Sequence, residues 1–454
     1  MDTVGLSTCN GTSTGLPPAG SERTPTQGIA ARPRSIAETG LTERFLADLV
    51  CKHLFEGGVL DLHELTRRLA LSGSVLEEVF GFLRADALAE VRGSNPGNTV
   101  LRYGLTERGR TAALEAFGRD GYVGPAPVPL EQYRRTVEAQ SLSTHVVSRQ
   151  AIHAAFADTV IRPELLDQLG PALHSGRAMF IYGPAGTGKS FIARRLARLL
   201  PDAVLIPHAV LVADKAMQCF DPGVHTPLKR GNTPDEALQL DRGHDPRYAP
   251  CERPVIVTGG ELTLDMLEVQ YDPATRTHRA PLQLRANNGM LVIDDLGRQR
   301  MEPLQLFNRW IVPLEERHDF LTLSNGQHFQ VPFDVALVFS TNRNPLQLAD
   351  EAFLRRIGYK IRFHHLREAD YLTIWQQECR RRGIEHNPEL ARFVVHELHA
   401  HHGVPLLPCH PRDLLDLAWD YTRYMDQPNL SADALCWAWD SYFVQLDEPD
   451  EVAP

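Results

Sequence analysis

The spacing of apolar residues divides the chain into regions of different character. Residues 1–38 are rich in Gly, Ser, Thr and Pro without apolar periodicity, which predicts a disordered tail. Over residues 39–120 helical spacing alternates with a tight turn and two strand-like runs around a Pro/Gly turn. A stretch rich in Gly and Pro follows, so residues 121–140 are predicted to form a linker.

Residues 141–365 alternate short apolar runs with amphipathic segments, a pattern typical of a parallel sheet flanked by helices. The predicted fold class is therefore α/β. Two stretches, about residues 221–288 and 321–333, read as insertions that each carry a hairpin; the second contains the turn signal Asn325-Gly326. Strand signals then end, and residues 366–447 are predicted to form a small helical bundle before an acidic tail, 448–454.

Composition narrows the class of protein. A chain of 454 residues, 43% of them hydrophobic, predicts two or three domains. The formal net charge of -10 argues against a globally basic coat for nucleic acid. Seven scattered cysteines without a CxxC pair indicate a reduced compartment, and neither an export signal nor a run of about 18 apolar residues occurs. We expect a cytoplasmic protein without a membrane segment.

The stretch "FIYGPAGTGKS", residues 180–190, meets the phosphate-loop pattern in full, with strand residues before it and an amphipathic helix after it. Glycines let backbone N–H groups turn toward phosphates, Lys189 supplies a positive charge, and the Ser190 hydroxyl suits Mg²⁺. The expected cofactors are ATP and Mg²⁺. The expected ATP-binding residues of the loop are Gly183, Pro184, Ala185, Gly186, Thr187, Gly188, Lys189, Ser190 and Phe191.

Polar side chains end two further apolar runs. In "GMLVIDDLGRQR" the run ends at Asp294 and Asp295, where open α/β sheets place their ligands. Asp294 is predicted to hold Mg²⁺ and Asp295 to orient the attacking water; the alternative for Asp295 is a capping role. "VALVFSTN" ends in Asn342, which is predicted to sense the γ-phosphate or to position water.

These motifs, with Leu-Arg-Arg at 354–356 and "HPRDLL" at 410–415, resemble the AAA+ ATPases in order and spacing over about residues 141–445. The resemblance implies a homo-oligomeric, hexameric ring in which residues 366–447 form a lid. It implies that Arg356, with Arg355 second, acts on the neighbouring subunit's nucleotide, and that Arg412 touches the γ-phosphate of its own. A plainer reading of the two adjacent arginines is that they stabilise a helix dipole. Relatives more often carry Glu where Asp295 stands, and the shorter side chain implies slow hydrolysis.

The hairpin before "VALVFSTN" and the elaboration before Asp294 resemble the AAA+ branch of MoxR-like chaperones, magnesium chelatase subunits and enhancer-binding activators. "GGELTLDML" and "ADEAFLRRI" are similar to a bacterial group described as ATPases with chaperone activity. The resemblance implies hairpins that point into a ring pore and contact a protein substrate. Ordinary surface hairpins remain the alternative.

Residues 39–120 resemble a winged helix in element order and in "YGLTERGR". The helix expected to read DNA, "VLEEVFGFLRADAL", carries Glu77, Glu78 and Asp86 against Arg84 alone. Since phosphate attraction supplies most non-specific DNA affinity, this face favours a protein partner or adaptor. A basic edge leaves DNA contact open as the less favoured alternative: Arg92, Arg102, Arg108 and Arg110.

Together these features predict an AAA+ Mg-ATPase that remodels a protein substrate. A DNA-directed regulator or loader and a slow, nucleotide-gated assembly switch are the alternatives.

Two further clusters of possible metal-binding residues are weaker signals. "HELHAHH", residues 396–402, departs from the metalloprotease pattern and is predicted to be a solvated helix end. Zinc binding by an inserted loop is the less favoured hypothesis for four residues, Cys219, His225, His244 and Cys251.

Overall fold

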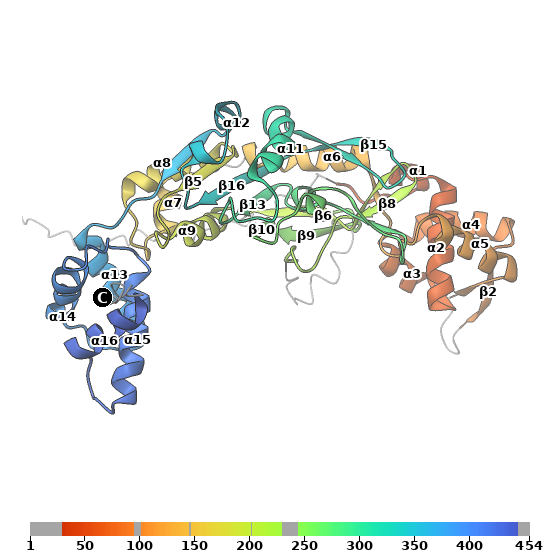
Figure 1. Cartoon of the computed structure of the whole chain (residues 1–454). Helices are drawn as coiled ribbons and strands as arrows, with labels where there is room; N and C mark the ends of the chain where they lie inside the picture. Colours follow the sequence, from red (N-terminus) through yellow and green to blue (C-terminus); the bar gives the residue numbers. More distant parts are fainter. Residues whose placement is uncertain (1–29, 95–100, 145–146, 201, 229–243, 444–454) are drawn as a thin grey trace, which may run out of the picture.

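The computed structural model describes residues 30–94, 101–144, 147–200, 202–228 and 244–443, which form an arch (Figure 1). One end of the arch holds the N-terminal helices, the middle holds the parallel sheet, and the other end holds the C-terminal helices. Among the described residues, no helix is both long and apolar enough to cross a membrane.

Five parallel strands form the central sheet in the order β10-β13-β16-β5-β17. Every residue of β13 and β16 is buried, as expected for parallel strands covered on both faces. The strand bounds are β5 Met179–Tyr182, β10 Val255–Thr258, β13 Gly289–Ile293, β16 Val335–Thr341 and β17 Tyr359–Arg362.

Side chains that alternate along β5 pack on different helices. Met179 and Ile181 join the cluster that contains the apolar sides of α8 (Pro163–His174) and α9 (Lys189–Leu196). Phe180 faces the opposite way and joins the cluster of α11 (Pro303–Glu316) and α12 (Glu351–Arg356). The sheet is therefore sandwiched between helices, and together with the phosphate loop this confirms the α/β P-loop fold class. Shorter helices complete the layers: η1 Leu142–Thr144, α7 Arg149–Ala155, η2 Ala197–Leu199, η4 Leu264–Leu267, α10 Leu282–Arg285 and η5 Pro345–Gln347.

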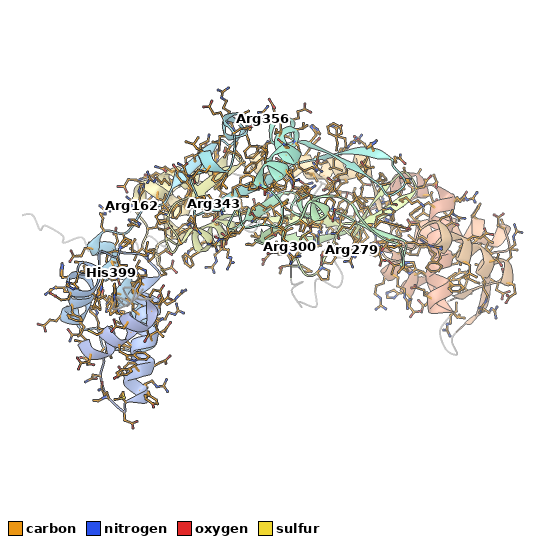
Figure 2. All side chains as sticks on the ribbon, viewed as in Figure 1. Arg162, Arg279, Arg300, Arg343, Arg356 and His399 are labelled. Carbon is orange, nitrogen blue, oxygen red and sulfur yellow. The ribbon has the colours of Figure 1, made fainter. Side chains whose placement is uncertain are left out.

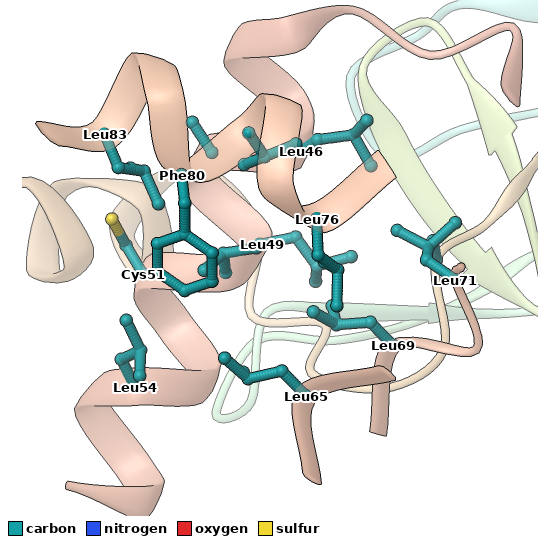
Figure 3. Packing of buried hydrophobic residues seen from close by; sticks show 14 of the residues in the cluster. Leu46, Leu49, Cys51, Leu54, Leu65, Leu69, Leu71, Leu76, Phe80 and Leu83 are labelled. Atoms are coloured by element: carbon teal, nitrogen blue, oxygen red, sulfur yellow. The ribbon is translucent and has the colours of Figure 1, made fainter. Parts of the chain in front are cut away.

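The N-terminal domain has its predicted helices and two strands in the expected order, and one further short strand, β1, that was not predicted. Its three strands form an antiparallel sheet, β1-β3-β2, beside a core of leucines and Phe80 (Figure 3). Phe80 stacks on Tyr103 with ring centroids 3.8 Å apart, which joins α4 to the sheet. The bounds are α2 Glu43–Gly57, β1 Leu60–Asp61, α3 Leu62–Leu69, α4 Gly73–Ala85, β2 Ala89–Ser94, β3 Leu101–Leu105 and α5 Glu107–Arg119.

The end of the predicted disordered tail is ordered. Residues 30–38 lead into α1 (Ile36–Thr39), and both Ala30 and Thr39 are buried. Ala30 accepts a hydrogen bond from the backbone N–H of Asp245, so contacts with a distant loop fix this segment. The prediction for 1–38 is therefore wrong over residues 30–38, and the remainder lies outside the described residues.

The prediction of a linker at 121–140 is also wrong, because this segment packs against both neighbours. Tyr122 and Val128 are buried, and residues Leu130–Ala139 form helix α6. The ammonium of Lys52, itself buried, donates to the carbonyl oxygens of Asp120 (3.1 Å) and Tyr122 (2.7 Å). The buried apolar side chains of the Gly/Pro stretch thus fix it against its neighbours, so it does not act as a free hinge.

A second sheet, in the order β11-β12-β8-β7-β4, connects the N-terminal domain to the central module. The predicted insertion at 221–288 has the wrong bounds, because its residues Val255–Thr258 pair with β13 as part of the central sheet. The added strands that follow α9 begin earlier than predicted, at Ala203, and β4 joins them from the segment before the central sheet. Their bounds are β4 Val128–Pro129, β6 Ala203–Pro207, β7 Ala209–Val212, β8 Lys215–Gln218, β9 Tyr248–Glu252, β11 Gln270–Asp272 and β12 Thr277–Arg279.

Both predicted hairpins form, β11–β12 and the pair β14 (His318–Thr322) and β15 (His328–Pro332). The backbone N–H of Gly121, just after α5, donates to the carbonyl of Arg276 at the tip of the first hairpin (3.0 Å). His278 of that hairpin and Ser324 of the second lie within hydrogen-bonding distance, 2.9 Å. Both hairpins therefore lie between the N-terminal domain and the central sheet.

The C-terminal residues form the predicted helical bundle around buried Tyr371, Trp375 and Trp439. The expectation of a solvated helix end for the "HELHAHH" segment is wrong for His399, which is buried, whereas His396, His401 and His402 are exposed. The Nε2 of His399 lies 3.0 Å from the Tyr371 hydroxyl, and burial lowers the pKa of His399. The bounds are α13 Glu368–Arg382, α14 Pro388–Phe393, η6 Val394–His399, α15 His410–Tyr424 and α16 Ala432–Tyr442.

Candidate nucleotide site

The phosphate loop connects β5 to α9 at the carboxyl edge of the central sheet. Gly183, Gly186 and Gly188 all have positive φ, a region that side chains avoid. A Cβ atom on Gly183 would lie 2.3 Å from the carbonyl oxygen of Phe363, and one on Gly186 would lie 2.7 Å from Cys409 Sγ. Glycine is therefore required by the turn itself and by the C-terminal residues that approach it.

The Lys189 ammonium is held within the loop. Its Nζ donates to the carbonyl oxygens of Gly183 (2.9 Å) and Pro184 (2.8 Å) and to Asn342 Oδ1 (2.6 Å). Burial lowers the pKa of Lys189, while the nearby carboxylates of Asp295 and Asp294 oppose that shift. All three acceptors are neutral oxygens. Phosphate oxygens form stronger, charge-assisted bonds, so this ammonium is placed to exchange its partners for an anionic ligand.

Asp295 and Asn342 meet at the ends of neighbouring strands, β13 and β16. Asn342 Nδ2 donates to Asp295 Oδ1 at 3.3 Å, so a continuous chain joins Lys189, Asn342 and Asp295. Asp295 has a left-handed backbone, with φ of 49°, in the turn that follows β13. These two hydrogen bonds bring together an ammonium, an amide and a carboxylate from three separate elements.

A cavity of about 980 Å³ surrounds this chain. It lies between the phosphate loop, the segment before α8, and the C-terminal bundle. Val160, Ile161 and Ile374 contribute apolar side chains to its lining. Its size and mixed lining suit a nucleotide, whose base is apolar and whose phosphates are charged. Predicted site residues that line it are Ala185, Gly186, Thr187, Gly188, Lys189, Ser190, Phe191, Asp295, Asn342 and Arg412.

Arg412 reaches the cavity from the first turn of α15. Its Nε donates to Asp413 at 2.7 Å, and this hydrogen bond raises the pKa of the guanidinium. Cys409, directly before α15, also lines the cavity, and burial raises the pKa of its thiol. The C-terminal bundle therefore closes one side of the cavity with a permanently charged group.

Magnesium chemistry fits the residues at the sheet edge. Mg²⁺ prefers a few oxygen ligands and completes its shell with phosphate oxygens and water. Ser190 lines the cavity, and the half-buried Asp294 directly follows β13, where its Oδ1 accepts from the backbone N–H of Asp295 (3.1 Å). A hydroxyl and one carboxylate suffice for such a site. The described residues contain no cluster of three or more His, Cys, Asp or Glu side chains that could hold a metal.

Five of the predicted site residues lie outside the cavity lining: Gly183, Pro184, Asp294, Arg355 and Arg356. Arg356 extends from the end of α12 on the outer side of the arch (Figure 2). It pairs with Glu315 at 2.9 Å and caps the Ala352 carbonyl at 2.8 Å, whereas Arg355 pairs with Glu351 at 3.4 Å. Neither arginine therefore lines the nucleotide cavity of its own chain.

Sequence analysis missed the apolar residues of the cavity lining and one residue behind the carboxylates. Val160, Ile161 and Ile374 come from segments far apart in the chain, so no local motif marks them. Gln299 binds the turn that carries Asp295 and lies inside the quoted stretch "DDLGRQR"; its spacing of four residues from Asp295 was the available signal.

Zinc binding by the inserted loop gains no support. His225 is fully occupied by the protein: one ring nitrogen accepts from the Asp221 backbone N–H and the other lies 2.9 Å from the Arg285 carbonyl. Burial raises the pKa values of the Cys219 and Cys251 thiols to about 12, which disfavours the thiolates that zinc requires.

Comparison with known proteins gives partial matches. A family model described as a domain of unknown function, DUF8689, matches residues 367–441, within the C-terminal bundle. No curated protein matches the chain. A variant of RuvB from Thermotoga maritima is 12% identical, over 66% of this chain and 72% of that one, with a TM-score of 0.35. NtrX from Brucella abortus is 14% identical, over 72% of this chain and 59% of that one, with a TM-score of 0.36. The fold class rests on the strand order and phosphate loop of the chain itself.

Proposed function

We propose that this protein is an Mg-ATPase of the AAA+ type that acts as a ring and remodels a protein partner. The observation that carries the proposal is the series of hydrogen bonds from Lys189 through Asn342 to Asp295, at the edge of a parallel sheet and inside a nucleotide-sized cavity. Open α/β sheets bind ligands at this edge. This series of hydrogen bonds begins at the lysine of a phosphate loop, which favours ATP over an uncharged ligand.

Each side chain has a role that its place supports. Lys189 and the loop N–H groups bind the β- and γ-phosphates, and Asp295 accepts a hydrogen bond from the attacking water. Asn342 moves between Lys189 and the γ-phosphate and thereby reports which nucleotide is bound. Mg²⁺, held by Ser190 and Asp294, would neutralise charge on the phosphates. Arg412 contributes a second fixed charge from the C-terminal bundle.

A ring would bring an arginine of the next subunit to the nucleotide, in addition to Arg412 of the same chain. Phosphoryl transfer gains from an arginine near the γ-phosphate, and Arg356 points away from the cavity of its own chain. We place Arg356 at the nucleotide of the next subunit. Its ion pair with Glu315 orients the guanidinium at the end of α12. The side chain of Arg355 is 80% exposed and pairs with Glu351 on the same helix.

A protein partner suits the N-terminal domain better than DNA does. The start of α4, the helix expected to read DNA, is covered by residues 33–36: Ser72 and Ser74 donate to the carbonyls of Pro33 and Arg34. Glu78 accepts from the Ile36 backbone N–H at 3.1 Å. This cover and the acidic charge both oppose phosphate contact. Because both hairpins lie beside the N-terminal domain, we assign them a supporting role there instead of contact with a threaded substrate.

A slow nucleotide-gated switch is the second candidate. It is favoured by the same hydrogen bonds, because Asn342 occupies Asp295 and must release it before that carboxylate can bind water. The two candidates share the site and differ in turnover.

Cysteine chemistry supports a reducing, cytoplasmic location for either one, since Cys51, Cys219, Cys251 and Cys379 are buried free thiols.

ATP hydrolysis by the purified full chain tests the proposal. We expect Mg²⁺-dependent turnover that falls about 100-fold or more in Asp295→Asn, with ATP still bound, because the amide is a poor acceptor for the proton of water. Asp265→Asn, the same change at an exposed aspartate of η4, is the matched control and retains the wild-type rate. Turnover below about one ATP per hour in the wild type would instead identify the switch.

A further inference from the structure

Gln299 lies behind the turn that carries Asp294 and Asp295. It is half-buried, and its neighbours Arg298 and Arg300 are exposed. Arg298 lines the cavity, and its Nη1 lies 3.8 Å from Asp295 Oδ2. Gln299 Oε1 accepts from the backbone N–H of Gly297 at 2.8 Å. Its Nε2 donates to the carbonyl oxygen of Asp294 at 3.0 Å and lies 3.4 Å from that of Asp295. One amide therefore spans the whole turn.

The same amide reaches a second segment. Gln299 Nε2 also lies 3.2 Å from the carbonyl oxygen of Gly259, which begins the loop after β10. Strand β10 is the neighbour of β13 in the central sheet. Gln299 thus fastens the carboxylate turn to the loop of the adjacent strand. The partners fix the orientation of the amide, since a backbone N–H only donates and a carbonyl only accepts.

This turn needs support because its backbone is unusual. Asp295 has φ of 49° and Gly297 has φ of 97°, so the chain is left-handed at a residue that is not glycine. Such conformations cost free energy and persist where surrounding contacts impose them. The neighbouring strand contributes too: the backbone N–H of Leu296 donates to Ser340 O at 2.8 Å, and the Thr341 hydroxyl donates to Leu296 O at 2.8 Å. These bonds hold Leu296, and the backbone N–H of Arg298 donates to the Asp295 carbonyl at 3.0 Å. The carbonyl of Asp294 has the Gln299 amide as its donor, at 3.0 Å.

We infer that Gln299 is a positioning residue for the proposed hydrolysis: it holds Asp295 in the orientation that faces the cavity and links that orientation to the loop at Gly259. Gln299 contacts Asp295 from behind and is not itself among the residues that line the cavity. The inference rests on the proposed function of Asp295. It adds a residue that a search for phosphate-loop motifs does not find, and a route by which movement of the loop after β10 reaches the carboxylate.

The test compares two substitutions at this position. Gln299→Glu keeps an acceptor for Gly297 but sets a charged oxygen against three carbonyls, and Gln299→Met removes every hydrogen bond at similar length. We expect kcat to fall on the order of 10- to 100-fold in both variants, since displacing a catalytic group by about 1 Å has effects of that size. The KM for ATP should stay within about twofold of wild type, because Lys189 and its loop are untouched.

Gln305→Glu is the matched control. Gln305 is exposed on α11, six residues along the chain, and its side chain makes none of the hydrogen bonds described for the structure. It should keep the wild-type kcat. If Gln299→Glu does not fold, as judged by circular dichroism, Gln299→Met decides the outcome. A kcat within twofold of wild type in the folded Gln299 variants, or a change confined to KM, would overturn the inference.

Amide hydrogen exchange separates this inference from the proposed function. Loss of the Gln299 hydrogen bond should speed exchange at the Gly297 N–H at least tenfold in Gln299→Met, whether or not the protein hydrolyses ATP. If Asp295→Asn retains full turnover, the role proposed for Asp295 fails while the exchange result stands. Unchanged exchange at Gly297, with Asp295→Asn inactive, would refute the role of Gln299 alone.

Discussion

Replacement of Lys189 by alanine is expected to lower the affinity for ATP about 100-fold or more. Lys189 as a residue is 5% exposed, and its ammonium lies among three oxygens, so its charge is well placed. Truncating one partner of a buried charged pair costs about 2–5 kcal/mol in binding, which corresponds to such a loss. Isothermal titration calorimetry with Mg-ATP on the full chain measures it.

Lys360→Ala is the control for this substitution. Lys360 is exposed on β17, beside β5, and its replacement by alanine removes the same charge as Lys189→Ala does. Its Nζ donates to the Ile357 carbonyl, away from the loop. We expect ATP affinity within about twofold of wild type. Equal affinities for wild type and Lys189→Ala would refute the assignment of the phosphate loop.

Arg356→Ala is expected to leave ATP binding unchanged and to reduce turnover on the order of 10³-fold. An arginine supplied to the γ-phosphate from outside is worth about 10³ to 10⁵ in rate in phosphoryl transfer. The side chain does not line its own cavity, so binding within one chain does not depend on it. Single-turnover hydrolysis at saturating ATP measures the loss. Arg355→Ala, its neighbour, should cost less than tenfold.

Mixed assemblies test whether Arg356 acts between copies. Arg356→Ala chains retain Asp295, and Asp295→Asn chains retain Arg356, so an interface that combines them contains both groups. Hydrolysis by the mixture should exceed that of either variant alone. An additive rate at every mixing ratio would mean that Arg356 serves its own chain or has a structural role, for which the dipole of α12 is the simple explanation.

The sequence carried the local parts of the site well. The phosphate loop, the strand ends at Asp295 and Asn342, and Arg412 all follow from short motifs, and the structure brings them around one cavity. Their convergence is a consequence of parallel strands, whose carboxyl ends share one edge. The hairpins at Asn325-Gly326 and at residues 270–279 were also predictable, because turn residues mark them.

The remaining features depend on contacts between distant residues. Residues 121–140 have the composition of a linker, yet Tyr122 is buried and Lys52 binds its carbonyl oxygen. Composition indicates how flexible the isolated segment is, but it does not show that a side chain 70 residues away, that of Lys52, binds the segment. The strand at 255–258 was assigned to an insertion for a similar reason: an apolar run does not say which sheet it joins, and its pairing with β13 decides that.

The state of assembly with ATP tests the central claim most directly, since the account requires two copies of the chain to enclose each nucleotide. Mass photometry of the Asp295→Asn protein, with and without Mg-ATP, is the measurement. We predict a closed oligomer, a hexamer, that forms with ATP and is lost in Lys189→Ala. A protein that stays monomeric at saturating ATP while the wild type hydrolyses at its full rate would contradict the account.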